Sequence, residues 1–323
     1  MSVRIPHSPL FAAALLGCTA GAQAQTYPDK PIRIIVPLAA GGPTDVLARS
    51  IAQHLSENWG QAVVVDNRPG ANTNIGTAAV AKAHADGYTL LLTVNNLTIN
   101  PSLYQDIPFD SLKDFAPISL FATSPLVLVV NPNVPANSVQ ELIALARAQP
   151  GKLHFGSPGN GSPPHLAGAM FNTLAGVQMA HVPYKGITAA VTDLIGGQIE
   201  VMFPGSPIAL AHAKAGKLRA LASTGATRTA AAPELPTVAE SGLPGFEVSL
   251  WYGLLAPADT PPAIVGKLHD EVARIVALPA IVKQWAALGA EPVKTTPEEF
   301  AAYLKRDIAK WRKVIRDSGA KID

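Results

Sequence analysis

The amino-acid sequence predicts an α/β protein built of two lobes. Short apolar segments of strand character alternate with segments of helical periodicity, a pattern typical of mainly parallel sheets. The alternation runs through two cycles and then gives way to helical segments at the C-terminal end. With 323 residues, 48% of them hydrophobic and only 15% charged, the chain can form two cores and lacks the composition of a disordered protein.

The N-terminal residues predict export from the cytoplasm. Arg4 precedes an apolar run over residues 10–17, and Ala22 and Ala24 form a small-x-small cleavage site. We therefore expect a signal peptide over residues 1–24, cleaved after Ala24. Lipoprotein processing at Cys18 is the weaker alternative, because the large Leu16 fits a lipobox poorly.

The first cycle is expected to contain four strands and three helices. Ser138 and Glu141 form a capping box that opens the third helix. The expected strands are 32–36, 63–66, 90–93 and 127–130, and the expected helices are 45–59, 75–85 and 138–149.

The second cycle continues the alternation and is followed by helices. The expected strands are 153–156, 180–183, 199–203, 218–223 and 249–255, and the expected helices are 165–175, 187–195, 207–215, 261–276 and 280–288. A last helix opens at Thr296, with Pro297 in its first position. Apolar residues recur on this helix at helical spacing and are expected to face the core.

The predicted domain boundaries follow from these cycles. We expect residues 25–124 and 249–323 to form the first lobe and residues 125–248 to form the second. The chain would cross between the lobes near residues 124–126 and 247–249, and the C-terminal helices would pack on the first lobe.

Two glycine-rich turns, each between a strand and a helix, form the candidate binding site. Glycine lets a backbone approach a ligand, and a helix N-terminus offers free N–H groups to an anion. Such turns at the carboxyl ends of strands are typical ligand sites, and two of them facing each other could hold a dicarboxylate. The candidate contacts are Ala40, Gly41, Gly42, Thr44 and Asp45 in the first turn, and Ser157, Gly159, Asn160, Gly161, Ser162 and His165 in the second.

Further candidate contacts are expected near these turns, and purely structural roles for the turns also stay open. Tyr184 and Gly186 could form a third wall, and Asn95 and Asn96 could donate to a carboxylate. Alternatively, glycine-rich turns can simply connect strands to helices, and Asp45 could only cap a helix.

The sequence lacks the motifs of several other classes of functional site. Neither turn has the glycine spacing of a phosphate or dinucleotide loop, and there is no Gly-x-Ser-x-Gly sequence of a serine hydrolase. The spacing of His154, His165 and His181 matches no zinc site. A net charge of +2 without a basic stripe argues against nucleic acid. We therefore expect neither a metal nor a cofactor.

The chain resembles the substrate-binding proteins of tripartite tricarboxylate transporters, the Bug-type receptors. The resemblance covers essentially the whole mature chain. It rests on the segments 27–33, 37–45 with Gly-Gly-x-Thr-Asp, 66–71 (Asp-Asn-Arg-Pro-Gly-Ala), 86–90, 100–101, 181–186 (His-Val-Pro-Tyr-Lys-Gly), 216–221 and 236–240.

The resemblance implies a type II periplasmic binding protein fold, in which two α/β lobes close on a ligand in the cleft between them. It implies a small carboxylate as ligand and membrane permease subunits as partners, and we expect a monomeric receptor rather than an enzyme. Relatives carry an acid where this chain has Pro204, Gly205 and Ser206. We therefore expect a di- or tricarboxylic or aromatic acid without an amino group, with Ser206 as a further contact.

Two other functions stay open at this level. A periplasmic sensory partner of a two-component system would have the same sequence features, and the neighbouring genes would distinguish it from a transport receptor. An exported α/β enzyme is disfavoured, because the chain lacks nucleophile and metal motifs.

Overall fold

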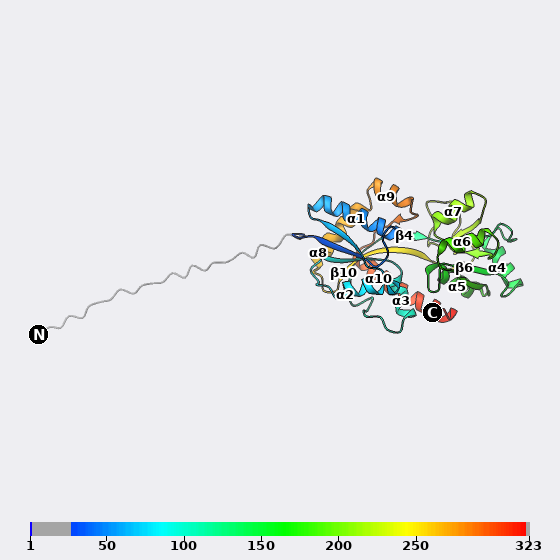
Figure 1. Cartoon of the computed structure of the whole chain (residues 1–323), viewed down its shortest axis with the longest axis horizontal. Coiled ribbons are helices and arrows are strands. Elements are labelled where there is room, and N and C mark those ends of the chain that lie inside the picture. Colours follow the sequence, from blue (N-terminus) through cyan, green and yellow to red (C-terminus); the bar gives the residue numbers. More distant parts are fainter. Residues whose placement is uncertain (2–26, 321–323) are drawn as a thin grey trace.

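The computed structural model describes Met1 and residues 27–320 (Figure 1). The expected cleavage after Ala24 and the alternative processing at Cys18 therefore lie outside the described residues. Within residues 27–320, no helix is both long enough and apolar enough to span a bilayer.

The molecule is elongated and contains two β-sheets, one in each half (Figure 1). The six-stranded sheet has the order β11 (Glu291–Pro292), β4 (Phe115–Pro125), β10 (Ser249–Pro257), β3 (Thr89–Thr93), β1 (Ile32–Val36) and β2 (Val63–Asn67). The five-stranded sheet has the order β7 (Ala180–Pro183), β6 (His154–Ser157), β8 (Val201–Met202), β5 (Val127–Val130) and β9 (Arg219–Ser223). We call the half around the six-stranded sheet lobe 1 and the other half lobe 2.

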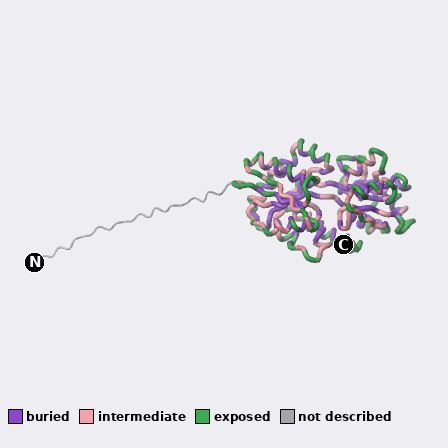
Figure 2. The backbone as a smooth tube through the Cα atoms, viewed as in Figure 1, coloured by how far each residue is buried: buried purple, intermediate pink, exposed green. Residues whose placement is uncertain are grey.

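Helices cover both sheets, as expected for apolar strands that are buried on two faces. Lobe 1 contains α1 (Pro43–Trp59), the 3₁₀ turn η1 (Ala71–Thr73), α2 (Asn74–Ala81), α3 (Asn96–Leu103), α8 (Pro262–Ile275) and α9 (Pro279–Ala286). Lobe 2 contains α4 (Val139–Ala148), α5 (Pro163–Ala175), α6 (Ile187–Ile195) and α7 (Ser206–Lys214). Buried segments run through the centre of both lobes and exposed ones lie around them (Figure 2).

The sheets are mixed, whereas the sequence pattern indicated mainly parallel sheets. Strand β1 pairs in parallel with β2 and β3, and β6 pairs in parallel with β7 and β8. By contrast, β10 runs antiparallel to both β3 and β4, and β5 runs antiparallel to β8 and β9. The antiparallel pairs arise where strands carry the chain between lobes, because a strand that returns from the other lobe enters its sheet in the opposite direction.

The chain leaves lobe 1 after Pro125 and returns to it at Ser249. Thr224 lies between these two crossing segments and is fully buried. Its hydroxyl accepts a hydrogen bond from the N–H of Leu126 (2.9 Å) and is placed to donate to the carbonyl of Val248 (2.5 Å). Thr224 therefore fastens the two crossings to each other.

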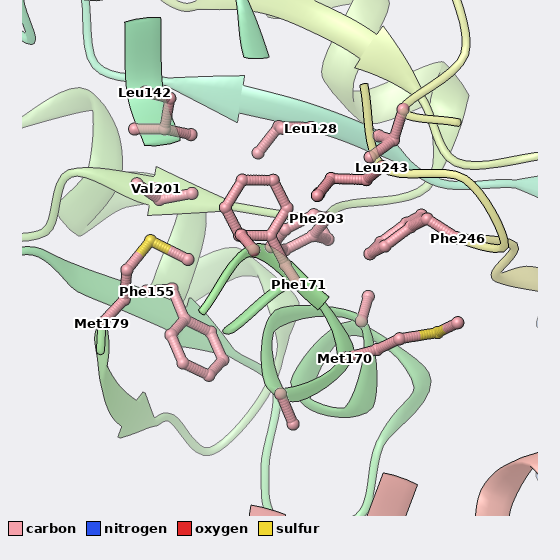
Figure 3. Packing of buried hydrophobic residues seen from close by; sticks show 14 of the residues in the cluster. Leu128, Leu142, Phe155, Met170, Phe171, Met179, Val201, Phe203, Leu243 and Phe246 are labelled. Atoms are coloured by element: carbon pink, nitrogen blue, oxygen red, sulfur yellow. The ribbon is translucent and has the colours of Figure 1, made fainter. Parts of the chain in front are cut away.

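A group of aromatic side chains fills the centre of lobe 2 (Figure 3). Phe171 of α5 and Phe203 after β8 have ring centroids 6.0 Å apart, and Phe246 lies 6.3 Å from each of them. Burying side chains of this size stabilises a fold by about 2–3 kcal/mol each. This core fixes β8 against α5 and so helps to position the turn that opens α5.

The C-terminal helix, α10 (Pro297–Ser318), belongs to both lobes. Phe300 and Leu304, in its first half, pack in a core of lobe 1. Trp311 and Ile315, in its second half, pack in the main core of lobe 2. The predicted core-facing stripe of this helix is confirmed. The C-terminal helices α8 and α9 and the first half of α10 pack on lobe 1, as expected, but the second half of α10 packs on lobe 2.

Most expected elements are present, with bounds within a few residues, but β4, α3 and the short β11 were not expected. Strand β4 carries prolines at positions 117 and 125 and small polar residues, which hide its apolar alternation. Helix α3 contains Pro101 and three polar residues in its first turns, so it lacks an amphipathic pattern. Both elements are stabilised by tertiary packing.

Candidate ligand-binding site

The first turn, residues 37–42, joins β1 to α1 and is open to solvent. Ala39, Ala40 and Gly41 are exposed, and a Cβ atom added at Gly41 or Gly42 would meet no atom within 4 Å. Gly41 has a φ of +86°, which explains why a glycine is needed there. In Figure 1 this dark-blue turn lies toward the middle of the long axis, where the lobes meet.

The N-terminus of α1 carries hydrogen-bond donors that the protein does not use. Within residues 27–320, the N–H groups of Ala40, Gly42 and Thr44 have no hydrogen-bond acceptor. Gly42 is the N-cap, and no side chain caps this helix end. Unpaired N–H groups together with the helix dipole favour an anion at this position.

Asp45, a predicted ligand contact, is bound to its own turn. It is 4% exposed, and its Oδ2 accepts the N–H of Gly41 (2.9 Å) and pairs with Nε of Arg49 (2.9 Å). Burial raises the pKa of this carboxyl, but hydrogen bonds from Arg49, Gly41 and Asn67 outweigh it and hold the pKa below its usual value. Asp45 is therefore an ionised carboxylate whose charge is balanced by Arg49.

The second turn, residues 158–162, is closed by internal hydrogen bonds. Ser157 is fully buried, and its hydroxyl accepts the N–H of Gly159 (3.2 Å). Ser162 donates to the carbonyl of Gly159 (2.6 Å) and caps α5 by accepting the N–H of His165 (3.4 Å). The N–H of Gly161 donates to Nδ1 of His165 (3.0 Å). Asn160 lies between these residues and is half-buried.

This arrangement leaves few free donors at the N-terminus of α5, where the sequence suggested an anion site. Pro163 and Pro164 occupy its first positions and have no N–H, and the next N–H, that of His165, already donates to Ser162. The amides of Gly159 and Gly161 are also bonded within the turn. The N-terminus of α5 is therefore a poor anion site, although the turn stays a shaped wall.

Tyr184 and Gly186, two further candidate contacts, lie next to this turn. The N–H of Tyr184 donates to the carbonyl of Ser157 (2.9 Å), which fixes the two segments together. The Tyr184 hydroxyl donates to Asp193 (2.8 Å); burial, together with this carboxylate, raises its pKa to about 12. Gly186, with a φ of +119°, is the N-cap of α6.

Helix α6 offers the donors that α5 lacks. It contains no proline in its first turn, and no side chain caps it. The N–H groups of Gly186, Ile187 and Thr188 have no acceptor within the described part of the chain. Lys185, directly before the N-cap, is exposed.

The two asparagines predicted as ligand contacts, Asn95 and Asn96, bond to different parts of the structure. Asn95 is 1% exposed, and its amide bridges to β10 by donating to the carbonyl of Ser249 (2.9 Å) and accepting the N–H of Trp251 (3.0 Å). It therefore holds a crossing strand. Asn96 is half-buried and donates to Oδ1 of Asn72 (2.7 Å), so it lies beside η1 in lobe 1.

Ser206 lies at the start of α7 and is 1% exposed. Its hydroxyl has no partner within the described residues. A Cβ atom added at Gly289 of lobe 1 would lie 2.7 Å from this hydroxyl, so Ser206 is at a contact between the lobes.

Arg49 and Asn67 are bonded to the first turn, although the sequence did not single them out. Nη2 of Arg49 donates to Oδ1 of Asn67 (3.1 Å), and Asn67 in turn donates to the carbonyl of Leu38 in the first turn (3.1 Å). The i, i+4 spacing of Asp45 and Arg49 on one helix was a usable signal for the ion pair. Nothing in the local sequence indicates that Asn67 reaches the turn.

The profile of the tripartite tricarboxylate transporter family receptor matches residues 47–320. The chain belongs to this family. This receptor is 41% identical over 311 residues to protein BugT of Bordetella pertussis, an alignment that covers 96% of this chain and 95% of BugT. Its family is one of substrate-binding receptors and not of enzymes.

Two solved structures similar to this receptor contain carboxylates. Rpa4515 of R. palustris, solved with adipate, is 36% identical with a TM-score of 0.76, and the match covers 92% of this receptor and 100% of that chain. MatC of Rhodopseudomonas palustris, solved with bound malate, is 29% identical with a TM-score of 0.72, covering 90% and 100%. The type II two-lobed fold and the receptor function are thereby established for this chain at the family level.

Proposed function

We propose that this receptor works outside the cytoplasm, captures a small carboxylate between its lobes and delivers it to a tripartite tricarboxylate-type permease. The observation that carries the proposal is the set of unbonded N–H groups of Ala40, Gly42 and Thr44 at the open N-terminus of α1. A carboxylate placed there would accept charge-assisted hydrogen bonds and interact favourably with the helix dipole.

A second carboxylate would bind at the start of α6. The unbonded N–H groups of Gly186, Ile187 and Thr188 and the exposed Lys185 supply donors and a positive charge on lobe 2. The α5 turn, with Asn160 at its centre, would form the wall between them. A ligand that contacts both lobes binds the closed arrangement more tightly than an open one, so its binding would drive closure.

The ligand would lack an amino group. The positions after β8 are Pro204, Gly205 and Ser206, none of which is acidic. The carboxylates beside the two candidate helix ends are already engaged: Oδ2 of Asp45 pairs with Arg49 while its Oδ1 is buried, and Asp193 accepts the hydroxyl of Tyr184. An ammonium group entering this site would find no exposed carboxylate oxygen at Asp45, and its desolvation would be poorly compensated.

A thermal-shift screen of di-, tri- and aromatic carboxylic acids on the purified mature protein tests the proposal. A ligand at 100 times its Kd stabilises the folded protein by about 2.7 kcal/mol. Malate and aspartate form a matched pair, because they differ in a hydroxyl and an ammonium group. We expect stabilisation by one or more acids, and less by aspartate than by malate.

The outcomes separate the parts of the proposal. Stabilisation by aspartate alone would show that the exclusion of amines is wrong, and stabilisation by no acid would contradict carboxylate capture. Uptake of the identified acid by cells that lack this receptor, compared with wild-type cells, then tests delivery to the permease.

A further inference from the structure

The first turn needs something to hold its shape, because little packs on it. Leu38 contacts the core, but residues 39–41 are exposed and the space around Gly41 and Gly42 is empty. A turn of this kind would sample many conformations unless hydrogen bonds restrain it. A ligand that binds to its N–H groups would then lose affinity in proportion to the ordering it must impose.

A closed chain of hydrogen bonds restrains this turn at both ends. From Gly41 it runs through the carboxylate of Asp45 to Nε of Arg49, both contacts being 2.9 Å. From Nη2 of Arg49 it continues to Oδ1 of Asn67 (3.1 Å), and the amide of Asn67 returns to the carbonyl of Leu38 (3.1 Å). We call the side chains of Asp45, Arg49 and Asn67 the turn clamp.

Asn67 is itself fixed by the sheet. It is the last residue of β2 and pairs in register with Val36 at the end of β1. The N–H of the following Arg68 donates to the carbonyl of Val36 (2.8 Å). The turn clamp therefore connects the first turn to the paired ends of β1 and β2.

We propose that Arg49 and Asn67 are positioning residues, which hold the first turn in the shape that presents its N–H groups to a ligand carboxylate. This inference rests on the proposed function and adds a division of labour to it. Asn67 holds the carbonyl of Leu38 and so fixes the position of the turn. Arg49 connects Asn67 to Asp45 and also neutralises Asp45, whose unbalanced negative charge would otherwise repel an anion at the same helix end.

The division of labour predicts a graded series of variants. Asn67→Ala removes the anchor only, and we expect about 3- to 10-fold weaker binding of the acid. Arg49→Lys keeps a positive charge near Asp45 but cannot make both contacts, and we expect a similar loss. Arg49→Ala leaves a buried carboxylate unbalanced, and we expect about 10- to 100-fold weaker binding.

The affinities are measured by calorimetric titration with malate and adipate as probes. Asn172→Ala is the matched control, because Asn172, like Asn67, forms a hydrogen bond through each end of its amide, in its case to the main chain of Met179 (2.8 and 3.1 Å), but lies at the far end of α5. We expect this control to lower stability without weakening binding more than twofold. Equal losses for Asn67→Ala and Asn172→Ala would overturn the proposal.

A measurement without ligand keeps this inference separate from the proposed function. The amide hydrogen of Gly41 is protected by Asp45, so Asn67→Ala should accelerate its exchange, measured by NMR, by about 3- to 10-fold, while amides of β6 and α5 keep their rates. Unchanged Gly41 exchange would contradict the clamp. Clamp-dependent exchange in a protein that binds no acid would instead contradict the proposed function alone.

Discussion

His165 and His181 stack face to face beneath the second turn, with ring centroids 3.8 Å apart and an angle of 11° between the rings. Nδ1 of His165 accepts the N–H of Gly161, so this nitrogen must be unprotonated. Nε2 of His181 lies 2.7 Å from the hydroxyl of Ser157. The turn is therefore supported by a pair of neutral imidazoles, and its shape depends on their protonation state.

Acidification should destabilise the protein through this pair. Burial lowers the pKa of His165 from 6.5 to about 4, and burial together with the neighbouring His165 lowers that of His181 from 6.5 to about 4. The folded protein then binds fewer protons than the unfolded chain between these values, so the free energy of unfolding decreases as pH falls from about 6.5 to about 4. Protons can reach the pair through a groove of about 790 Å³ that both rings line.

Urea unfolding of wild type and His165→Asn at pH 7 and pH 5 measures this effect. The asparagine Oδ1 can take the place of Nδ1 as acceptor but does not titrate, so we expect a smaller loss of stability between the two pH values. His84→Asn, at an exposed histidine, is the control and should behave as wild type. An undiminished pH dependence in His165→Asn would show that other groups cause it.

At the scale of elements, α10 is attached to lobe 1 by a buried carboxylate. Asp307 is 2% exposed, and its Oδ2 accepts hydrogen bonds from Thr98 of α3 (2.7 Å), Trp251 of β10 (3.1 Å) and Trp311 of α10 (3.1 Å). Its Oδ1 pairs with Lys310 (2.7 Å). Directly beyond this cluster, α10 enters the core of lobe 2, so Asp307 fixes the point from which the helix crosses.

Removing this carboxylate should cost more than removing an exposed one. Asp307→Ala leaves the buried donors of Thr98, Trp251 and Trp311 and the ammonium of Lys310 without their acceptor, and we expect a loss of about 3–5 kcal/mol in the free energy of unfolding. Asp317→Ala, which removes a carboxylate paired with Lys313 and Arg316 on the surface of the same helix, should cost about 0–1 kcal/mol. Denaturant titration measures both, and equal losses would contradict the role of Asp307.

At the scale of the whole molecule, the lobes touch at a point apart from their connecting segments. Gly289, between α9 and β11, has a φ of +68° and packs against Ser206 and Pro207 of lobe 2. Nearby, Glu291 of β11 accepts a hydrogen bond from the hydroxyl of Thr229 in lobe 2 (2.6 Å). These contacts fix how closely the lobes approach on this side.

A side chain at Gly289 should push the lobes apart there. In Gly289→Ala the new Cβ would lie 2.4 Å from Pro207, so the contact must open, and we expect a larger radius of gyration in small-angle scattering and a loss of about 1–3 kcal/mol in stability. Gly60→Ala is the control: its φ is +65°, but no atom lies within 4 Å of the added Cβ. If both variants scatter like wild type, Gly289 does not limit the approach of the lobes.

Much of the fold was predictable because apolar periodicity and capping signals are local. The bounds of α6 and β1 and the start of α10 at Thr296 were predicted correctly. The two turns were also found from their glycines and their place between strand and helix. The hydrogen bond that anchors the first turn to β2 was not predicted, because the carbonyl of Leu38 accepts it from Asn67, which is far away along the chain.

The alternation of strands and helices, the positions of the two turns and the membership of a receptor family follow from the sequence alone. Which donors at those turns are free follows from the folded structure, because it depends on which side chains reach the same N–H groups. In this receptor the donors of the α5 turn are bonded to Ser157, Ser162 and His165. Within the described residues, the N–H groups of Ala40, Gly42 and Thr44 at α1 and of Gly186, Ile187 and Thr188 at α6 have no internal acceptor. Residue types indicate where an anion could bind, and the hydrogen bonds that side chains make in the folded turns leave only some of those donors available.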